Sequence, residues 1–264
     1  MLEVYGSIGI VAGIAQVLFL ATAFLLAGHL LLQARRSREL PELLLGLHLL
    51  LAMGAGYLLI SIGVVAAQHA AAPPREMIAF LIGAGYLATI LGLIATLIFN
   101  YRVFRPGSRR ALAFVWLVIA AMGLGWAGYG LSGEFGRARF EGTWLWLMIG
   151  GILAANLWVA LEPLLYRRQL LRRLQLGLAE PLVVDRFLLW GCGSLARTAM
   201  VVVGAIASLV EQRIVPETAL TLTVGVLVFA SACGLFTAVT YWLTFFPTQR
   251  YSRWVSRRYA SSGS

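Results

Sequence analysis

The sequence predicts an all-α integral membrane protein, a bundle of seven transmembrane helices with the N-terminus outside and the C-terminus in the cytoplasm. Three observations lead to this fold class. Apolar residues make up 60% of the 264 residues and charged residues only 12%, with a mean hydropathy of +0.85. Seven apolar stretches are each close to the roughly 20 residues that cross a bilayer. The arginines are concentrated in alternate gaps between these stretches.

The seven predicted spans use almost the whole chain and leave no room for a separate soluble domain. They cover about 7–33, 42–67, 77–99, 111–132, 143–165, 187–210 and 218–246. We therefore expect a single membrane domain over 1–249 and a short basic cytoplasmic tail over 250–264. The tail is expected to begin as an interfacial anchor and to be disordered. Glu3 stands where a signal peptide has basic residues, so the first stretch is expected to be a retained helix.

The distribution of arginine predicts the orientation. Sixteen of the 21 basic residues lie in the gaps after the first, third and fifth spans or in the tail, and all 21 are arginine. These residues are Arg35, Arg36, Arg38, Arg102, Arg105, Arg109, Arg110, Arg167, Arg168, Arg172, Arg173, Arg186, Arg250, Arg253, Arg257 and Arg258. The opposite side has Arg75, Arg137, Arg139 and Arg213. By the positive-inside rule, the richer side is cytoplasmic.

The longest cytoplasmic gap runs from Arg167 to Asp185 and contains arginines and leucines at helical spacing. Two interpretations fit this pattern. The fifth helix either ends near the membrane with arginines that snorkel to the interface, or continues past the membrane or along its surface.

Composition and motifs exclude several classes of function. The chain has no lysine, so no Schiff base to retinal can form on a lysine amine. The net charge of +10 is divided among separate loops, which is typical of topology signals and not of a nucleic-acid-binding surface. No P-loop, GxSxG, CxxC or HExxH motif is present. The sequence therefore offers no positive argument for an enzyme.

Spans two, three and four contain related patterns of glycine and aromatic residues. They read Gly54-Ala55-Gly56-Tyr57, Gly83-Ala84-Gly85-Tyr86 and Gly125-Trp126-Ala127-Gly128-Tyr129. The glycines predict faces where helix backbones approach closely. All three tyrosines fall in the predicted outer half. Tyr57, Tyr86, Trp126 and Tyr129 are therefore candidates for an outward-facing aromatic ligand pocket, with ordinary packing and an aromatic belt as the alternative.

Arg197 is the arginine that no loop or helix end explains, because it lies near the middle of the sixth span. A charge at that depth costs about 2.5–3.5 kcal/mol on insertion scales, so it requires an acceptor. Glu162 and Asn156 are candidate acceptors. We expect Arg197 and these acceptors to form either a structural ion pair or an anion-binding or coupling site.

His29, His48 and Glu162 are predicted at one depth, in the cytoplasmic quarter of the membrane. Two histidines and a carboxylate at one level could hold a metal or relay protons, and the histidines could ligate haem. Neither histidine belongs to a ligand motif. The alternative is that both are hydrogen-bonded between helices or reach the interface.

Three functions remain open. The first is a sensory or regulatory protein that binds a small apolar or aromatic ligand within the bundle and signals to a cytoplasmic protein partner. The second is a small-solute or proton-coupled transporter, and the third is a haem- or metal-binding membrane protein. The seven-helix layout resembles rhodopsins and G-protein-coupled receptors in topology alone, which does not imply their function. We expect a multi-pass protein of a bacterial inner membrane, in contact with anionic lipid headgroups, and small-residue faces allow an oligomer.

Overall fold

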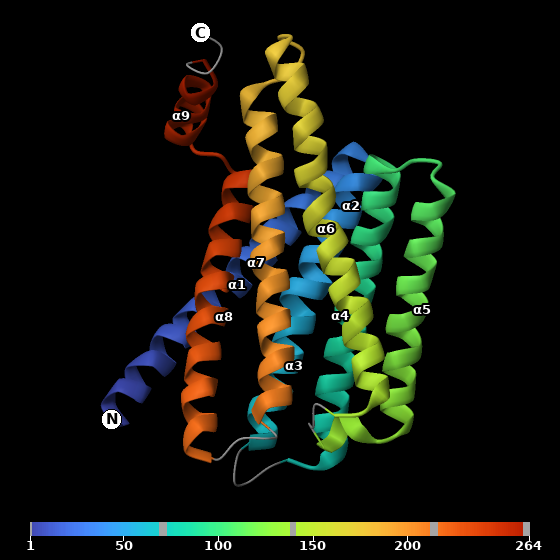
Figure 1. Cartoon of the computed structure of the whole chain (residues 1–264), viewed down its shortest axis with the longest axis vertical. Helices are drawn as coiled ribbons and strands as arrows, with labels where there is room; N and C mark the ends of the chain where they lie inside the picture. Colours follow the sequence, from blue (N-terminus) through green and yellow to red (C-terminus); the bar gives the residue numbers. More distant parts are fainter. Residues whose placement is uncertain (1, 69–72, 138–140, 212–215, 261–264) are drawn as a thin grey trace. The chain divides into compact units, whose positions relative to one another are not determined.

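The structure, a computed structural model, describes residues 2–68, 73–137, 141–211 and 216–260, and in these ranges every regular element is helical. Figure 1 shows the helices as ribbons. In chain order they are α1 (Leu2–Ser37), α2 (Leu40–His48), the π-helix η1 (Leu49–Gly56), α3 (Tyr57–Gln68), α4 (Arg75–Phe104), α5 (Arg109–Leu131), the 3₁₀ turn η2 (Glu134–Arg137), α6 (Thr143–Gln175), α7 (Pro181–Glu211), α8 (Pro216–Phe245) and α9 (Gln249–Ala260).

Among the described residues, seven helical stretches are long and apolar enough to cross a membrane. They are Gly9–Ser37, Leu40–Ala67, Arg75–Phe104, Arg109–Leu131, Thr143–Gln175, Pro181–Val210 and Thr221–Phe245. The predicted all-α class with seven long apolar helices is therefore confirmed. The fifth of these helices, α6, continues to Gln175, so the arginines and leucines after residue 165 extend the helix.

Local chemistry explains where the helices begin and end. Ser108 caps α5, because its side chain accepts a hydrogen bond from the backbone N–H of Ala111 at 3.3 Å. At the end of α6, Gly177 adopts a left-handed φ of 71°. The N–H of Leu178 reaches back to the carbonyl of Arg173 at 2.8 Å, and that of Gly177 to Leu174 at 3.0 Å. These two bonds form a Schellman C-cap, which fixes the end of the extended helix.

The chain packs as two compact units. One unit is Ala23–Ala155, and the other combines Met1–Thr22 with Asn156–Ser264. The boundaries fall inside α1 and α6, so two continuous helices each contribute to both units. Hydropathy detects each helix as one apolar run and carries no information on which neighbours its two halves contact.

In the unit Ala23–Ala155, α4 packs against α2, η1 and α3 through glycines. A Cβ at Gly92 would lie 2.6 Å from the backbone nitrogen of Ala52. A Cβ at Gly85 would lie 2.9 Å from the backbone nitrogen of Ile60, and one at Gly56 would lie 2.9 Å from the Gly85 carbonyl oxygen. The predicted close approach of helix backbones at the glycine patterns is confirmed.

In the unit that contains Asn156–Ser264, α7 and α8 run side by side (Figure 1). Their antiparallel contact is lined by hydroxyl side chains. The helix α9 packs on α7, where the sequence predicted a disordered tail. It is ordered because Tyr251, Val255 and Tyr259 recur every four residues on one side, and Val255 is fully buried. The last four residues, 261–264, lie outside the described ranges.

Large apolar side chains cover the outsides of the long helices. Phe80 is 70% exposed, Leu117 69% and Leu124 60%, and each lies within a candidate span. A water-soluble monomer rarely exposes apolar surface over so many elements. Helices that satisfy their own backbone hydrogen bonds and expose such side chains suit contact with a lipid bilayer.

Candidate functional site

An aromatic cluster forms where α4, α5 and η2 meet in the unit Ala23–Ala155. Phe135 of η2 lies at its centre. Its ring centroid is 6.2 Å from that of Tyr86 on α4, in a stacked arrangement. The Tyr129 ring on α5 meets it edge-on at 4.9 Å, and Trp126 lies 6.2 Å away. Phe135, Tyr129 and Tyr86 are all buried. These separations are typical of favourable aromatic pairs.

Two glycines, Gly83 of the pattern on α4 and Gly130 directly after the pattern on α5, make room for the Phe135 ring. A Cβ at Gly83 on α4 would lie 3.3 Å from this ring, and one at Gly130 on α5 would lie 3.2 Å from it. The carbonyl of Gly83 also accepts a hydrogen bond from Trp126 Nε1 at 2.9 Å. This bond satisfies the indole N–H and fixes the orientation of the Trp126 ring. The cluster is thus a shaped recess that an aromatic ring fills.

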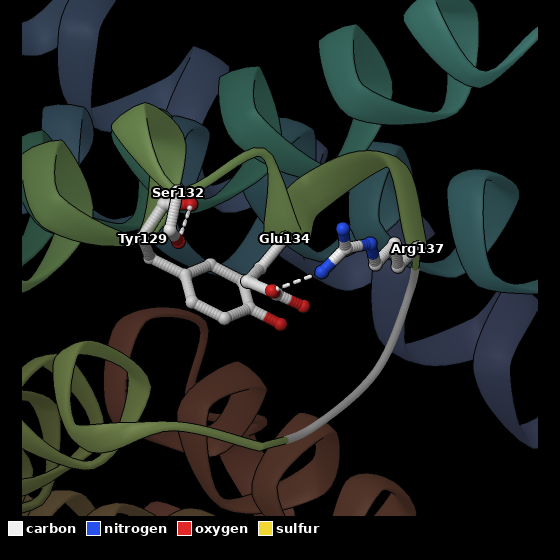
Figure 2. A network of polar contacts seen from close by, with 4 residues as sticks. All are labelled: Tyr129, Ser132, Glu134 and Arg137. Atoms are coloured by element: carbon white, nitrogen blue, oxygen red, sulfur yellow. Dashed lines mark hydrogen bonds and ion pairs between the residues drawn. The ribbon is translucent and has the colours of Figure 1, made fainter.

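A short polar network holds the segment that carries Phe135 (Figure 2). The Ser132 hydroxyl donates to the Tyr129 carbonyl at 2.9 Å and ends α5. Gly133 follows with a left-handed φ of 72°, a conformation that favours glycine. Arg137 forms an ion pair with Glu134 across η2. The Glu134 carboxylate lies beside the Tyr129 hydroxyl, with which it interacts electrostatically. This turn therefore presents Phe135 to the recess.

Three of the four aromatic residues predicted for a pocket meet in this cluster, namely Tyr86, Trp126 and Tyr129. Tyr57 begins α3 and is half-buried, and its side chain is hydrogen-bonded to Ser61 one turn later. Sequence reasoning missed Phe135. Its position two residues after Gly133 and directly before Gly136 was the available signal, because glycines on both sides allow a tight turn that inserts a side chain.

The contact between α7 and α8 contains the second concentration of buried polar groups. The hydroxyls of Ser194 and Tyr241 are 2.8 Å apart, and the Thr237 hydroxyl donates to the Gly193 carbonyl at 3.1 Å. Arg197, which is only 7% exposed, lies one turn after Ser194 on α7 and interacts electrostatically with Tyr241. The sequence predicted the buried Arg197 but not the hydroxyl-rich helix that faces it.

Glu162 and Asn156, the predicted acceptors for Arg197, are both buried on α6. The Glu162 carboxylate accepts a hydrogen bond from Trp158 Nε1 on the same helix at 2.8 Å. This bond across one helical turn orients the carboxylate. The pairing of Arg197 with Glu162 or Asn156 remains a prediction.

The two predicted histidines occupy different environments. His48 is buried at the end of α2, and its Nδ1 lies 3.1 Å from the carbonyl oxygen of Gly92 on α4. His29 lies on the exposed side of α1. Among the described residues, no group of three or more His, Cys, Asp or Glu side chains is placed to hold a metal ion. A role in haem or metal binding stays a prediction.

Aromatic and charged residues fix α9 on its own unit. The Tyr251 hydroxyl donates a hydrogen bond to the buried carboxylate of Asp185 on α7. Arg167 Nη2 on α6 donates to the Tyr259 hydroxyl at 3.2 Å. Burial, and after it the hydrogen bond to Asp185, raises the pKa of the Tyr251 hydroxyl. The Arg258 guanidinium lies 5.4 Å from the centre of the exposed Trp254 ring, one turn away on the same helix.

Comparison of the chain with protein-family models, with curated proteins and with solved structures found no match.

Proposed function

We propose that this chain is a sensory or regulatory membrane protein whose ligand is a small aromatic molecule that takes the place of the Phe135 ring. The observation that supports the proposal is the recess itself. Tyr86, Trp126 and Tyr129 surround one benzene ring, and Gly83 and Gly130 leave space for it. The ring arrives on a four-residue turn and not on a transmembrane helix. A turn can be displaced at much lower cost than a helix.

The arginine distribution supports an outside N-terminus and a cytoplasmic C-terminus, in the bacterial inner membrane. In that orientation the turn that carries Phe135 lies on the outer side. The extended end of α6 and the helix α9 lie on the cytoplasmic side, where they are available to a protein partner. Their arginines also suit contact with anionic lipid headgroups.

A ligand at the recess would act by moving η2. The ligand ring and the Phe135 ring compete for one volume, so binding requires the turn between Gly133 and Arg137 to withdraw. Withdrawal breaks the contact of Phe135 with Tyr86 on α4, the helix that also packs on α2, η1 and α3. The protein has two arrangements, one with Phe135 inserted and one with the turn withdrawn. The free energy available for a change in α4 is set by the difference between the ligand's affinities for these two arrangements.

Thermal unfolding of the full-length protein in nanodiscs, with and without indole as the probe, tests the ligand site. We expect indole to raise the melting temperature of the wild type and to raise that of Phe135→Ala more, because no ring then competes for the recess. Phe135→Ala alone should lose about 3–5 kcal/mol of stability. The matched control is Phe99→Ala, since Phe99 is equally buried on α4 but contacts Phe104; its response to indole should equal that of the wild type.

Three results would overturn the proposal. The ligand site is wrong if indole and a panel of substituted benzenes leave the wild-type melting temperature unchanged, or if Tyr129→Ala retains the full response. The regulatory role is wrong if indole binds but leaves tryptic cleavage at the arginines of α6 and α9 unchanged.

A further inference from the structure

Asn100 is the most anomalous polar residue in the structure. It lies on α4, one turn before the helix ends at Phe104, and its side chain is fully buried. Neither its Oδ1 nor its Nδ2 has a hydrogen-bond partner among the described residues. Buried amides in native proteins are satisfied by protein groups or by ordered water. A molecule that both donates and accepts hydrogen bonds would satisfy both atoms.

Asn100 continues a line of polar groups along one face of α4. Gly92, Thr96 and Asn100 are spaced by four residues, so each lies one turn beyond the last. The Thr96 hydroxyl, also fully buried, donates to the Gly92 carbonyl at 3.2 Å. Its oxygen keeps lone pairs that can accept a further hydrogen bond. A molecule bound at Asn100 can therefore also donate to Thr96.

The same carbonyl connects this line to His48. A carbonyl oxygen only accepts, so the contact of 3.1 Å between Nδ1 of His48 and the Gly92 oxygen places a hydrogen on Nδ1. In the neutral ring, Nε2 then carries the lone pair. The polar line thus runs from an imidazole through Gly92 and Thr96 to an amide near the arginine-rich end of α4.

We propose that Thr96 and Asn100 bind internal water, and that this water connects the region of His48 with solvent at the arginine-rich end of α4. Water fits because an internal water requires two to four polar partners, and the two amide atoms with the Thr96 oxygen provide three. Both side chains are neutral, which favours a neutral ligand over an ion. This site is separate from the Phe135 recess, and the proposal does not depend on the function of that recess.

Hydrogen–deuterium exchange at C2 of the histidine rings, measured by mass spectrometry on the full-length protein in nanodiscs at one pD, tests the proposal. We expect measurable exchange at His48 in the wild type and exchange at least about fivefold slower in Asn100→Leu and in Thr96→Val. Asn100→Ser keeps a hydroxyl that can bind water and should retain most of the wild-type rate.

Two controls isolate the effect. His29, on the exposed side of α1, should exchange at the same rate in every variant. Thr89→Val should leave His48 unchanged, because Thr89 makes the same kind of bond on α4, to the Gly85 carbonyl, but on the far side of Gly92 from Asn100. The proposal is overturned if Asn100→Leu leaves His48 exchange at the wild-type rate. It is also overturned if Asn100→Leu raises the melting temperature by several degrees, since removal of a dry, unsatisfied amide would stabilise the protein.

Discussion

Two helix contacts in this protein are built on opposite principles. The contact of α4 with α2, η1 and α3 is closed by glycines, so that backbone lies against backbone at Gly56, Gly85 and Gly92. The contact of α7 with α8 is closed by hydroxyls, with Ser194 bonded to Tyr241 and Thr237 to the Gly193 carbonyl. Both solutions suit helices in lipid, where the tails are as apolar as the side chains and burial alone does not hold helices together.

The difference predicts how each contact fails. A glycine contact has no space for an added atom, so any enlargement must separate two backbones. A hydroxyl contact tolerates changes in size but depends on paired donors and acceptors. Sterics should therefore dominate the first contact and hydrogen bonding the second.

The largest effect is expected for Gly92→Ala. The new methyl would lie 2.6 Å from the Ala52 nitrogen and 2.8 Å from the Ala52 Cβ, and backbone atoms cannot rotate away. We expect a loss of about 2–3 kcal/mol in the free energy of unfolding, measured by titration with denaturant in mixed micelles. Gly123→Ala is the matched control, because nothing lies within 4 Å of its added Cβ and alanine favours the helix. Equal stabilities of the two variants would show that the glycine contact is not a close one.

An intermediate effect is expected at the hydroxyl contact. Tyr241→Phe and Ser194→Ala should each cost about 1 kcal/mol, because each leaves a buried hydroxyl without its partner. The double variant should cost less than the sum of the two, with a coupling energy of about 0.6 kcal/mol. The same denaturant titration measures this cycle. Strictly additive losses would mean that the Ser194–Tyr241 bond does not hold α7 to α8.

The smallest effect is expected for Tyr251→Phe, which removes the polar contact between α9, outside the candidate spans, and Asp185 of α7. Loss of the bond to Asp185 should release α9 by about 0.5–1 kcal/mol, which corresponds to roughly two- to fivefold faster tryptic cleavage at its arginines. Ser256→Ala, an exposed position on α9, should cleave at the wild-type rate.

The same contact should depend on pH in a defined direction. Because the pKa of Tyr251 is raised in the folded protein, its contribution is complete below the ordinary tyrosine value of about 10 and is lost as the pH rises through the folded value. Wild-type α9 should therefore loosen at strongly alkaline pH, as Trp254 fluorescence would report. A Tyr251→Phe protein with the same alkaline transition would assign it to another group.

The sequence was sufficient to predict where most of the helices lie. It was insufficient to predict which helices pack against one another. Hydropathy located the fourth span at about 111–132, and the helix is Arg109–Leu131. It placed the end of the fifth span at about residue 165, ten residues before α6 ends at Gln175, because the extension is held by helical spacing and a C-cap and not by apolar content.

Residues within the candidate sites were predicted unevenly for a related reason. Arg197, Tyr86 and Tyr129 stand out by type and depth, so they can be named from the sequence. Phe135 and Asn100 are candidate site residues because of the side chains that surround them in the folded protein, and not because of their residue type. Those surroundings depend on the rotation of each helix about its axis, which a hydropathy profile does not contain.

The π-helical stretch Leu49–Gly56 gives the second span a mechanical property that a plain α-helix lacks. His48 lies immediately before this stretch and Tyr57 immediately after it. A π turn contains more residues than an α turn, so the angular phase of one end relative to the other depends on how the stretch is wound. If Leu49–Gly56 returned to α-helical winding, His48 would rotate about the helix axis relative to Tyr57. A change of winding in Leu49–Gly56 would therefore alter the orientation of the His48 side chain relative to that of Tyr57.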